Sequence, residues 1–177
     1  NGTTWTQQAV LNAGSQMMYL PPVSVALAGD TAVVGTPASE QAHVFFRSGT
    51  TWSLSATLQS AGSQPGDLFG SSVGVAGAMA VVGAPGDGPS VNDGTGSAFI
   101  FVNSGTSWSQ QQKLTATDAA TGDAFGSAVV ISGDTVLIGA PMDDTMAGNN
   151  AGSGYFFTHV GTVWSQQGVV NPLDAAA

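Results

Sequence analysis

Short apolar runs and short polar segments follow one another in the same order several times along the chain. In its middle part, small residues at 70–76 precede a continuously apolar run at 80–82, an aromatic run at 99–101 and a polar run at 108–112. Short runs bounded by Gly, Pro, Asn and Asp are typical of β-strands, and no capped stretch with a 3.6-residue period indicates a helix. The pattern predicts an all-β chain with four short strands per unit.

The units are spaced regularly. The motif Gly-Thr-x-Trp recurs with tryptophans at Trp5, Trp52, Trp108 and Trp164, at intervals of 47, 56 and 56 residues. Repeats of roughly 40 to 60 residues with four strands each are typical of β-propellers, one unit per blade. A β-sandwich with duplicated hairpins is the alternative, and an interval that recurs without insertion favours the propeller. We therefore expect a β-propeller segment of three four-stranded blades plus one extra N-terminal strand.

The same repeat sets the expected boundaries. The chain divides into an outer strand of a preceding or partner blade (1–11), a first blade (12–58), a second blade (59–114), a third blade (115–173) and a tail (174–177).

Two pairs of motifs carry a family resemblance. Phe69-Gly70 followed by Gly83-Ala84-Pro85, and Phe125-Gly126 followed by Gly139-Ala140-Pro141, resemble FG-GAP repeats. Such repeats form the blades of the integrin α-subunit head and of many bacterial surface proteins. The resemblance covers essentially the whole chain and implies a propeller that works outside the cell or at its surface. It implies contacts with other proteins in adhesion or surface assembly.

The first unit departs from this family pattern, and the family's calcium-binding loop is missing from this chain. Pro21-Pro22 stands at the Phe-Gly position, and Gly35-Thr36-Pro37 replaces Gly-Ala-Pro, so the first blade is degenerate. Many FG-GAP repeats bind calcium in an Asp-x-Asp-x-Asp-Gly loop between their first two strands. Here that connection is a tight turn with at most one carboxylate, as at 132–135, whereas calcium needs six or more oxygens. No cofactor is expected, and calcium is disfavoured.

Another pair of loops holds short oxygen-bearing side chains. They join the second and third strands of two units and supply the candidate binding residues Asp87, Asn92, Asp93, Asp143, Asp144 and Asn149. Asp87 aligns with Asp143 and Asp93 with Asn149, so these four are weak candidates for metal ligands. Turns are rich in Asp and Asn for conformational reasons alone, and this interpretation is favoured.

Other polar residues offer little catalytic chemistry. Asp67 and Asp123 precede Phe-Gly by two residues and are expected to cap a turn rather than face a ligand. The Gly-x-Ser-x-Gly match around Ser72 lacks the helix and the acid–base partners of a hydrolase nucleophile. His43 aligns with aromatic residues and His159 with a polar turn position, so neither indicates a catalytic site. The chain is not expected to be an enzyme.

Composition narrows the possible partners. Only 2 Lys and Arg oppose 11 Asp and Glu, a net charge of −9, so phosphate neutralisation and nucleic-acid binding are excluded. The absence of Cys excludes disulfides and thiol catalysis, and no apolar stretch reaches the roughly 18 residues of a membrane helix. Abundant Ser, Thr, Gly and Gln with scarce Lys suit an extracellular or cell-surface protein.

Three functions fit these observations. The first is a non-catalytic module for protein–protein interaction, adhesion or surface assembly. The second is a lectin-like propeller that binds carbohydrate through its tryptophans, and the third is an accessory domain of a larger secreted enzyme. Three blades do not close a ring, since propellers use roughly four to eight. A protein partner, or self-association that completes the propeller, is therefore expected.

Overall fold

The computed structural model describes residues 4, 6–13, 24–91, 93–146 and 148–171, which contain twelve strands in three antiparallel sheets. Blade 1 consists of β1 (Ser24–Ala28), β2 (Thr31–Thr36), β3 (Gln41–Ser48) and β4 (Thr51–Leu58), with a short 3-10 turn, η1 (Pro37–Ser39), between β2 and β3. Blade 2 consists of β5 (Ser72–Ala76), β6 (Met79–Ala84), β7 (Ser97–Asn103) and β8 (Trp108–Leu114). Blade 3 consists of β9 (Ala128–Ser132), β10 (Thr135–Ala140), β11 (Ser153–Val160) and β12 (Val163–Val170).

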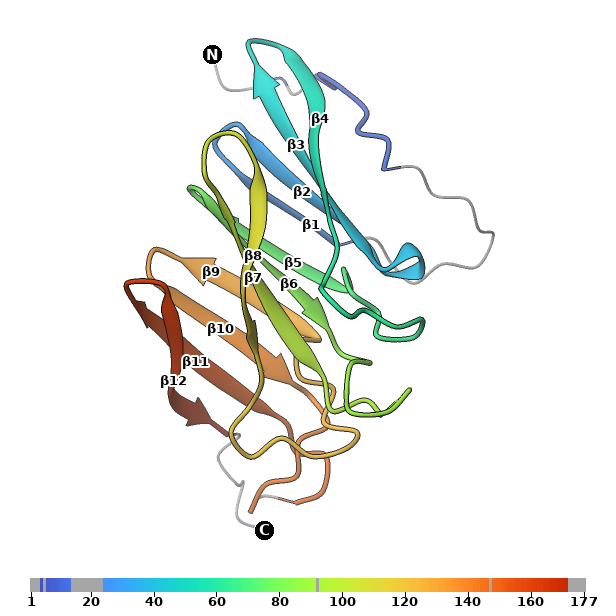
Figure 1. Cartoon of the computed structure of the whole chain (residues 1–177), viewed down its shortest axis with the longest axis vertical. Helices are drawn as coiled ribbons and strands as arrows, with labels where there is room; N and C mark the ends of the chain where they lie inside the picture. Colours follow the sequence, from blue (N-terminus) through green and yellow to red (C-terminus); the bar gives the residue numbers. More distant parts are fainter. Residues whose placement is uncertain (1–3, 5, 14–23, 92, 147, 172–177) are drawn as a thin grey trace.

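The three sheets lie side by side as consecutive blades, from blue-cyan through green to orange-red in Figure 1. The predicted three four-stranded blades are confirmed. The first strands begin at Ser72 and Ala128, two residues later than the sequence pattern suggests. Gly70 and Gly126 stand in their place with φ of 99° and 92°, so the chain turns there instead of extending. No helix within the described residues is long and apolar enough to cross a membrane.

The hydrophobic core lies in the two seams between neighbouring blades. One seam joins blades 1 and 2 and the other joins blades 2 and 3. Phe69 and Phe125 are fully buried in these seams. Phe69 meets Phe99 edge-on at 5.5 Å between ring centroids, and Phe125 meets Tyr155 in the same way at 5.4 Å. Each Phe-Gly motif therefore places one aromatic ring between its own blade and the preceding one.

A second repeated contact joins the outer strands of neighbouring blades. Trp164 Nε1 donates a hydrogen bond to Gln111 Oε1 of blade 2, at 3.0 Å. Gln111 is the extra residue at a β-bulge, since Ile100 pairs with Gln112 and Phe101 with Gln110. A bulge re-aims a side chain, and here it turns the glutamine towards the next blade. The tryptophan therefore anchors the outer strand of its own blade to the outer strand of the preceding blade.

The N-terminal segment makes the same contact on blade 1. Gln8, which aligns with Gln111, accepts a hydrogen bond from Trp52 Nε1 at 3.1 Å. Leu11 and Ala13 pack against the outer face of this sheet beside Phe45. The segment thus lies where the outer strand of a preceding blade would lie, although it pairs with no described strand. Trp5 and residues 1–3 lie outside the described residues.

Blade 1 lacks the long loop between its second and third strands, and Glu40 replaces part of it. In the seam of blades 2 and 3, the carbonyls of Gly94 and Thr95 accept hydrogen bonds from the N–H groups of Ala124 and Phe125. In the seam of blades 1 and 2, the Glu40 carboxylate accepts hydrogen bonds from the N–H groups that precede the glycine turn. The donors are Gly66 at 3.0 Å, Leu68 at 3.0 Å and Phe69 at 2.6 Å.

The outer-strand contact is missing at one of the three tryptophans that the structure describes, and this gives the first testable prediction. Ser55 stands where Gln8 and Gln111 stand, and Trp108 Nε1 is buried with no hydrogen-bond partner among the described residues. We expect Ser55→Gln to raise the free energy of unfolding by about 1 kcal/mol, because the amide oxygen satisfies a buried donor. Thermal unfolding measures the change, with Ser53→Gln on the same strand as the control. A loss of stability in Ser55→Gln would contradict the proposed equivalence.

The Glu40 contacts give the second prediction. In Glu40→Gln the side chain keeps its shape, but an amide nitrogen replaces one acceptor oxygen and the charge is lost. We expect the free energy of unfolding to fall by about 2 kcal/mol in Glu40→Gln and by more in Glu40→Ala, because hydrogen bonds to charged acceptors are strong. Urea unfolding provides the measurement, and equal stability of all three proteins would show that the contacts contribute nothing.

Candidate functional site

Each seam is closed by a close approach between two glycines. Gly35 faces the Gly70 carbonyl so closely that an added Cβ would lie 2.0 Å from its oxygen, and Gly83 faces the Gly126 carbonyl at the same 2.0 Å. The same two carbonyls accept hydrogen bonds from the hydroxyls of Ser24, at 3.0 Å, and Ser72, at 2.7 Å. The Phe-Gly turn of one blade is therefore seated on the Gly-x-Pro end of the preceding blade.

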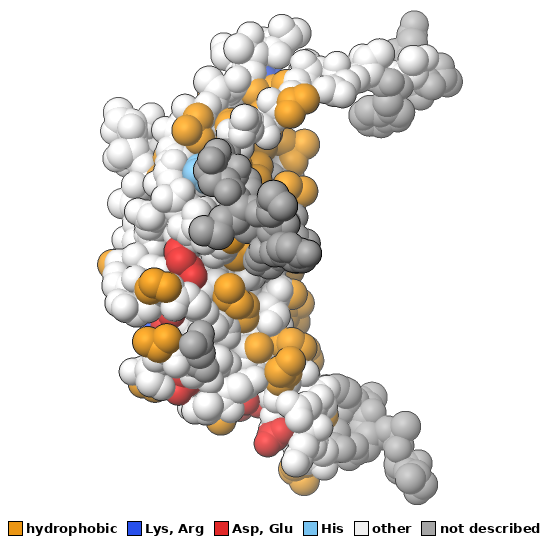
Figure 2. Space-filling view, turned by 90° about the vertical axis from the view of Figure 1, so that its right-hand side faces the viewer, with side chains coloured by type: hydrophobic (Ala, Val, Ile, Leu, Met, Phe, Trp, Pro, Cys, Tyr) orange, Lys and Arg blue, Asp and Glu red, His pale blue; other side chains and the backbone are white. Residues whose placement is uncertain are grey.

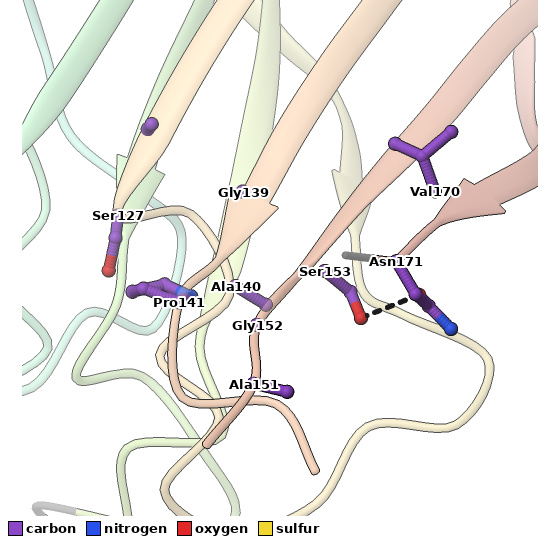
Figure 3. Close-up of a pocket in the computed structure, with 10 residues that line it drawn as sticks. Ser127, Gly139, Ala140, Pro141, Ala151, Gly152, Ser153, Val170 and Asn171 are labelled. Atoms are coloured by element: carbon purple, nitrogen blue, oxygen red, sulfur yellow. Dashed lines mark hydrogen bonds between the residues drawn. The ribbon is translucent and has the colours of Figure 1, made fainter. Parts of the chain in front are cut away.

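Blade 3 has the same features, but no turn within the described residues is seated on them. A Cβ at Gly139, the counterpart of Gly83, would meet nothing closer than the Ala128 Cβ at 3.5 Å. Around Gly139 lies an open hollow of about 650 Å³. Figure 3 shows Gly139, Ala140, Gly152 and Ser153 in its middle, with Ser127 and Pro141 on one side and Val170 and Asn171 on the other. We call this hollow the blade 3 socket.

The sheet face around the socket is apolar and uncovered. Val130 on β9 and Val170 at the end of β12 are each 53% exposed, whereas their counterparts in blade 2, Gly74 and Leu114, pack within the seam with blade 3. Figure 2 shows a curved molecule with hydrophobic side chains along the length of its concave side and carboxylates at separate places beside them. An apolar sheet face left open at one end is typical of an interaction surface.

The loop carboxylates that the sequence singles out are held by the fold itself. Asp87 and Asp143 occupy matched, buried positions. Asp87 Oδ2 lies 2.7 Å from Lys113 Nζ, and Asp143 Oδ2 accepts a hydrogen bond from the Tyr155 hydroxyl at 2.8 Å. Burial, and then this hydrogen bond, raise the pKa of Tyr155. Both carboxylates thus face partners in their own blade rather than solvent.

The remaining loop candidates build turns. Asp93 accepts hydrogen bonds from Thr95 and, across the seam, from the Thr121 hydroxyl, and the Thr95 bond holds the pKa of Asp93 below its usual value. Asp144 accepts a hydrogen bond from the backbone N–H of Asn150 at 2.8 Å. Asn149 is exposed, and Asn92 lies outside the described residues.

Ligand binding by these loops stays a prediction from the sequence. Within the described part of the chain, no three His, Asp or Glu side chains gather where they could hold a metal ion together. Asp87, Asp93, Asp143 and Asn149 stay candidate metal ligands on sequence grounds only.

Two further expectations about polar residues are confirmed. Asp67 and Asp123 are buried, and each accepts a hydrogen bond from the N–H three residues earlier at 2.6 Å, so they cap the turn that leads into Phe-Gly. Burial raises the pKa of Asp123, and the nearby charge of Asp143 adds to this effect. Ser72 is buried and donates its hydroxyl to the Gly126 carbonyl, so it serves the seam rather than a nucleophilic site.

The two histidines also have structural partners. His43 is buried, with Nδ1 3.2 Å from the Thr57 hydroxyl and no partner for Nε2 among the described residues. His159 lies 3.1 Å from Asp134 through Nε2 and stacks on Trp164 at 4.5 Å between centroids. Sequence comparison of the units placed both histidines correctly, but it missed the blade 3 socket.

His43 gives a prediction about pH. Burial lowers the pKa of His43 below its ordinary 6.5, whereas the unfolded chain keeps the ordinary value. Between the two values the unfolded state binds more protons than the folded state, so stability falls as pH drops through 6.5. His43→Phe, which matches Phe99 of blade 2, removes this dependence. Urea unfolding at about pH 7.5 and about pH 5 should therefore show that the free energy of unfolding falls more for the wild type than for the variant. Equal losses would contradict the prediction.

Comparison with known proteins agrees with the repeat structure. A family model described as FG-GAP repeat matches residues 52–101 and 108–157, which together form more than half of the chain. A search of curated proteins found no match.

Proposed function

The chain belongs to the FG-GAP repeat family, and on this premise we propose that it is a non-catalytic protein-interaction module. Its role is to stack the open face of blade 3 against a blade of a protein partner, outside the cell or at its surface. Adhesion and surface assembly are the settings that such a module serves.

One observation carries this proposal. The faces of blades 1 and 2 that point towards the following blade are covered by it, whereas the matching face of blade 3 presents Val130 and Val170 to solvent beside an open socket. Burial of apolar area contributes about 25 cal/mol per Å², so covering this face favours association. The face repeats the surface on which the chain already stacks its own blades.

A second copy of this chain is the partner that can be tested directly. Two copies of three blades give six, which lies within the usual range of propeller sizes. Blade 1 presents the opposite face, where Val25 is 72% and Leu27 is 67% exposed. The N-terminal segment lies where β12 of a second copy would lie, so joining these two faces requires the segment to move.

The lectin alternative receives less support than the interaction module. A lectin would need tryptophans exposed together on one face, but Trp164 is only 3% exposed and Trp108 is half-buried with its Nε1 covered. An accessory domain of a larger secreted enzyme needs no catalytic groups of its own, and the buried polar groups of this chain agree with that role as well as with an interaction module. The candidate groups Ser72, Asp87 and Asp143 are buried and occupied by partners in the fold.

Self-association through the two end faces gives the fourth prediction. Sedimentation velocity over a range of concentrations should show the wild type shifting from three-blade to six-blade particles. We expect Val130→Asp to abolish the shift, because it places a charge in an apolar contact. Gln8→Ala should promote association, since it weakens the hold of the N-terminal segment on Trp52.

Val160→Asp is the matched control, because Val160 is 85% exposed at the hairpin between β11 and β12, away from both faces. It should associate like the wild type. A wild type that stays monomeric and folded at every concentration would overturn self-association.

A further inference from the structure

The residues that border the blade 3 socket correspond, unit by unit, to the residues that hold a Phe-Gly turn in the two closed seams. A Cβ at Gly126 would lie 2.2 Å from the Ser97 carbonyl oxygen and 3.2 Å from the Ala84 nitrogen. Their counterparts 56 residues later, Ser153 and Ala140, line the socket together with Gly139. The hollow thus repeats the shape of the surface that receives Gly126.

The socket also offers the main-chain acceptors that the turn uses. In the closed seam, Gly94 and Thr95 accept hydrogen bonds from the N–H groups of Ala124 and Phe125, and Gly96 forms a parallel bridge with Phe125. The counterparts of these acceptors are Asn150 and Ala151. No described residue donates to their carbonyl groups.

We propose that the blade 3 socket is a recognition site for a Phe-Gly turn presented by another blade. This inference deepens the proposed function, on which it rests, by naming the element of the partner that is recognised. The turn adds its backbone beside Asn150 and Ala151 as a short parallel strand, which is a common mode of peptide recognition. Its glycine carbonyl lies against Gly139.

Specificity follows from the space at two glycines. On the socket side, a Cβ at position 139 would occupy the place of the incoming carbonyl, as the 2.0 Å distances at Gly35 and Gly83 show. On the partner side, the glycine must adopt a positive φ, and any side chain there would collide with the Ser153 carbonyl as it would with Ser97. The site therefore selects Phe-Gly and rejects Phe followed by any larger residue.

One feature of the socket differs from both closed seams. Ser24 and Ser72 donate their hydroxyls to the glycine carbonyl of the turn, and Ala128 stands at the matching position. The site lacks one hydrogen bond and binds its turn more weakly than the seams do. Weak docking suits a contact that forms between molecules rather than within one.

The probe is a cyclised peptide with the sequence of residues 64–71, Gln-Pro-Gly-Asp-Leu-Phe-Gly-Ser. Cyclisation is needed because Leu68 holds a φ of 59°, which a free chain rarely adopts. The peptide is titrated into the ¹⁵N-labelled full chain and followed by NMR. We expect the amide signals of Gly139, Ala140 and Gly152 to shift in a saturable manner.

Two variants of the protein and one of the peptide make the test specific. Ala128→Ser restores the missing hydroxyl and should tighten binding about three- to tenfold. Gly139→Ala fits the free chain, since its Cβ meets nothing closer than 3.5 Å, but it should abolish binding. The peptide carrying Gly70→Val should not bind to any of these proteins.

The outcomes separate this inference from self-association. Saturable shifts at the socket that respond to both variants support the site, even if the chain sediments as a monomer. Absence of binding, shifts elsewhere on the molecule, or equal affinity of Ala128→Ser and wild type would overturn the site, even if the chain self-associates. Unchanged signals in the Gly139→Ala protein without peptide confirm that this variant is folded.

Discussion

The close approach of a glycine on one blade to the carbonyl of a Phe-Gly turn on the next is the contact on which the architecture depends. At Gly35 and Gly83 even one added carbon would overlap that carbonyl, so these positions set the distance between blades. The fixed distance lets Phe69 and Phe125 fill the space between sheets without leaving a void. Close packing of this kind makes each seam sensitive to a single methyl group. The seams therefore repeat with little variation although the loops around them vary.

At the outer tips, blades 1 and 3 share an interaction although different groups make it. At the outer tip of blade 1, Arg47 pairs with Asp30 at 2.7 Å and lies over Trp52, and in blade 3 His159 pairs with Asp134 and stacks on Trp164. In blade 2 the matching residues are Asn103 and Ala78, so both members of the pair are replaced together. Glu40 and the Gly94–Thr95 carbonyls are exchanged in the same way. Equivalent positions in different units thus make the same contact with different groups. In this way a chain with only 7% charged residues still forms specific polar pairs.

The repeat period, the four strands per blade and the buried histidine could be predicted from the sequence because each follows from aligning the chain with itself. The roles of Asp67 and Asp123 could also be predicted, since capping is a local interaction. The socket was not predicted, because a single sequence does not say which face of a sheet lacks a neighbour. The sequence does differ at one telling position, since Ala128 stands where the other units have Ser24 and Ser72. This difference points to the socket only once both hydroxyls are known to bond across a seam. The inter-blade role of Gln111 was equally hidden, because the bulge that aims it is a property of strand pairing.

The two ends of the blade array are not equivalent, and this gives any assembly a direction. On blade 1, the N-terminal segment already supplies the outer-strand contact through Gln8 and covers part of the apolar face with Leu11. On blade 3, Gln167 is the residue at the bulge that aligns with Gln111, and its amide bonds only within its own strand, to Ser165, among the described contacts. A partner that docks on blade 3 therefore contacts the socket, the apolar face and the side-chain carbonyl of Gln167 together. A partner that docks on blade 1 must first displace a segment that imitates its own outer strand. For that reason the proposed association is expected first at the blade 3 end, and occupation of the blade 1 end then depends on how firmly the segment is held.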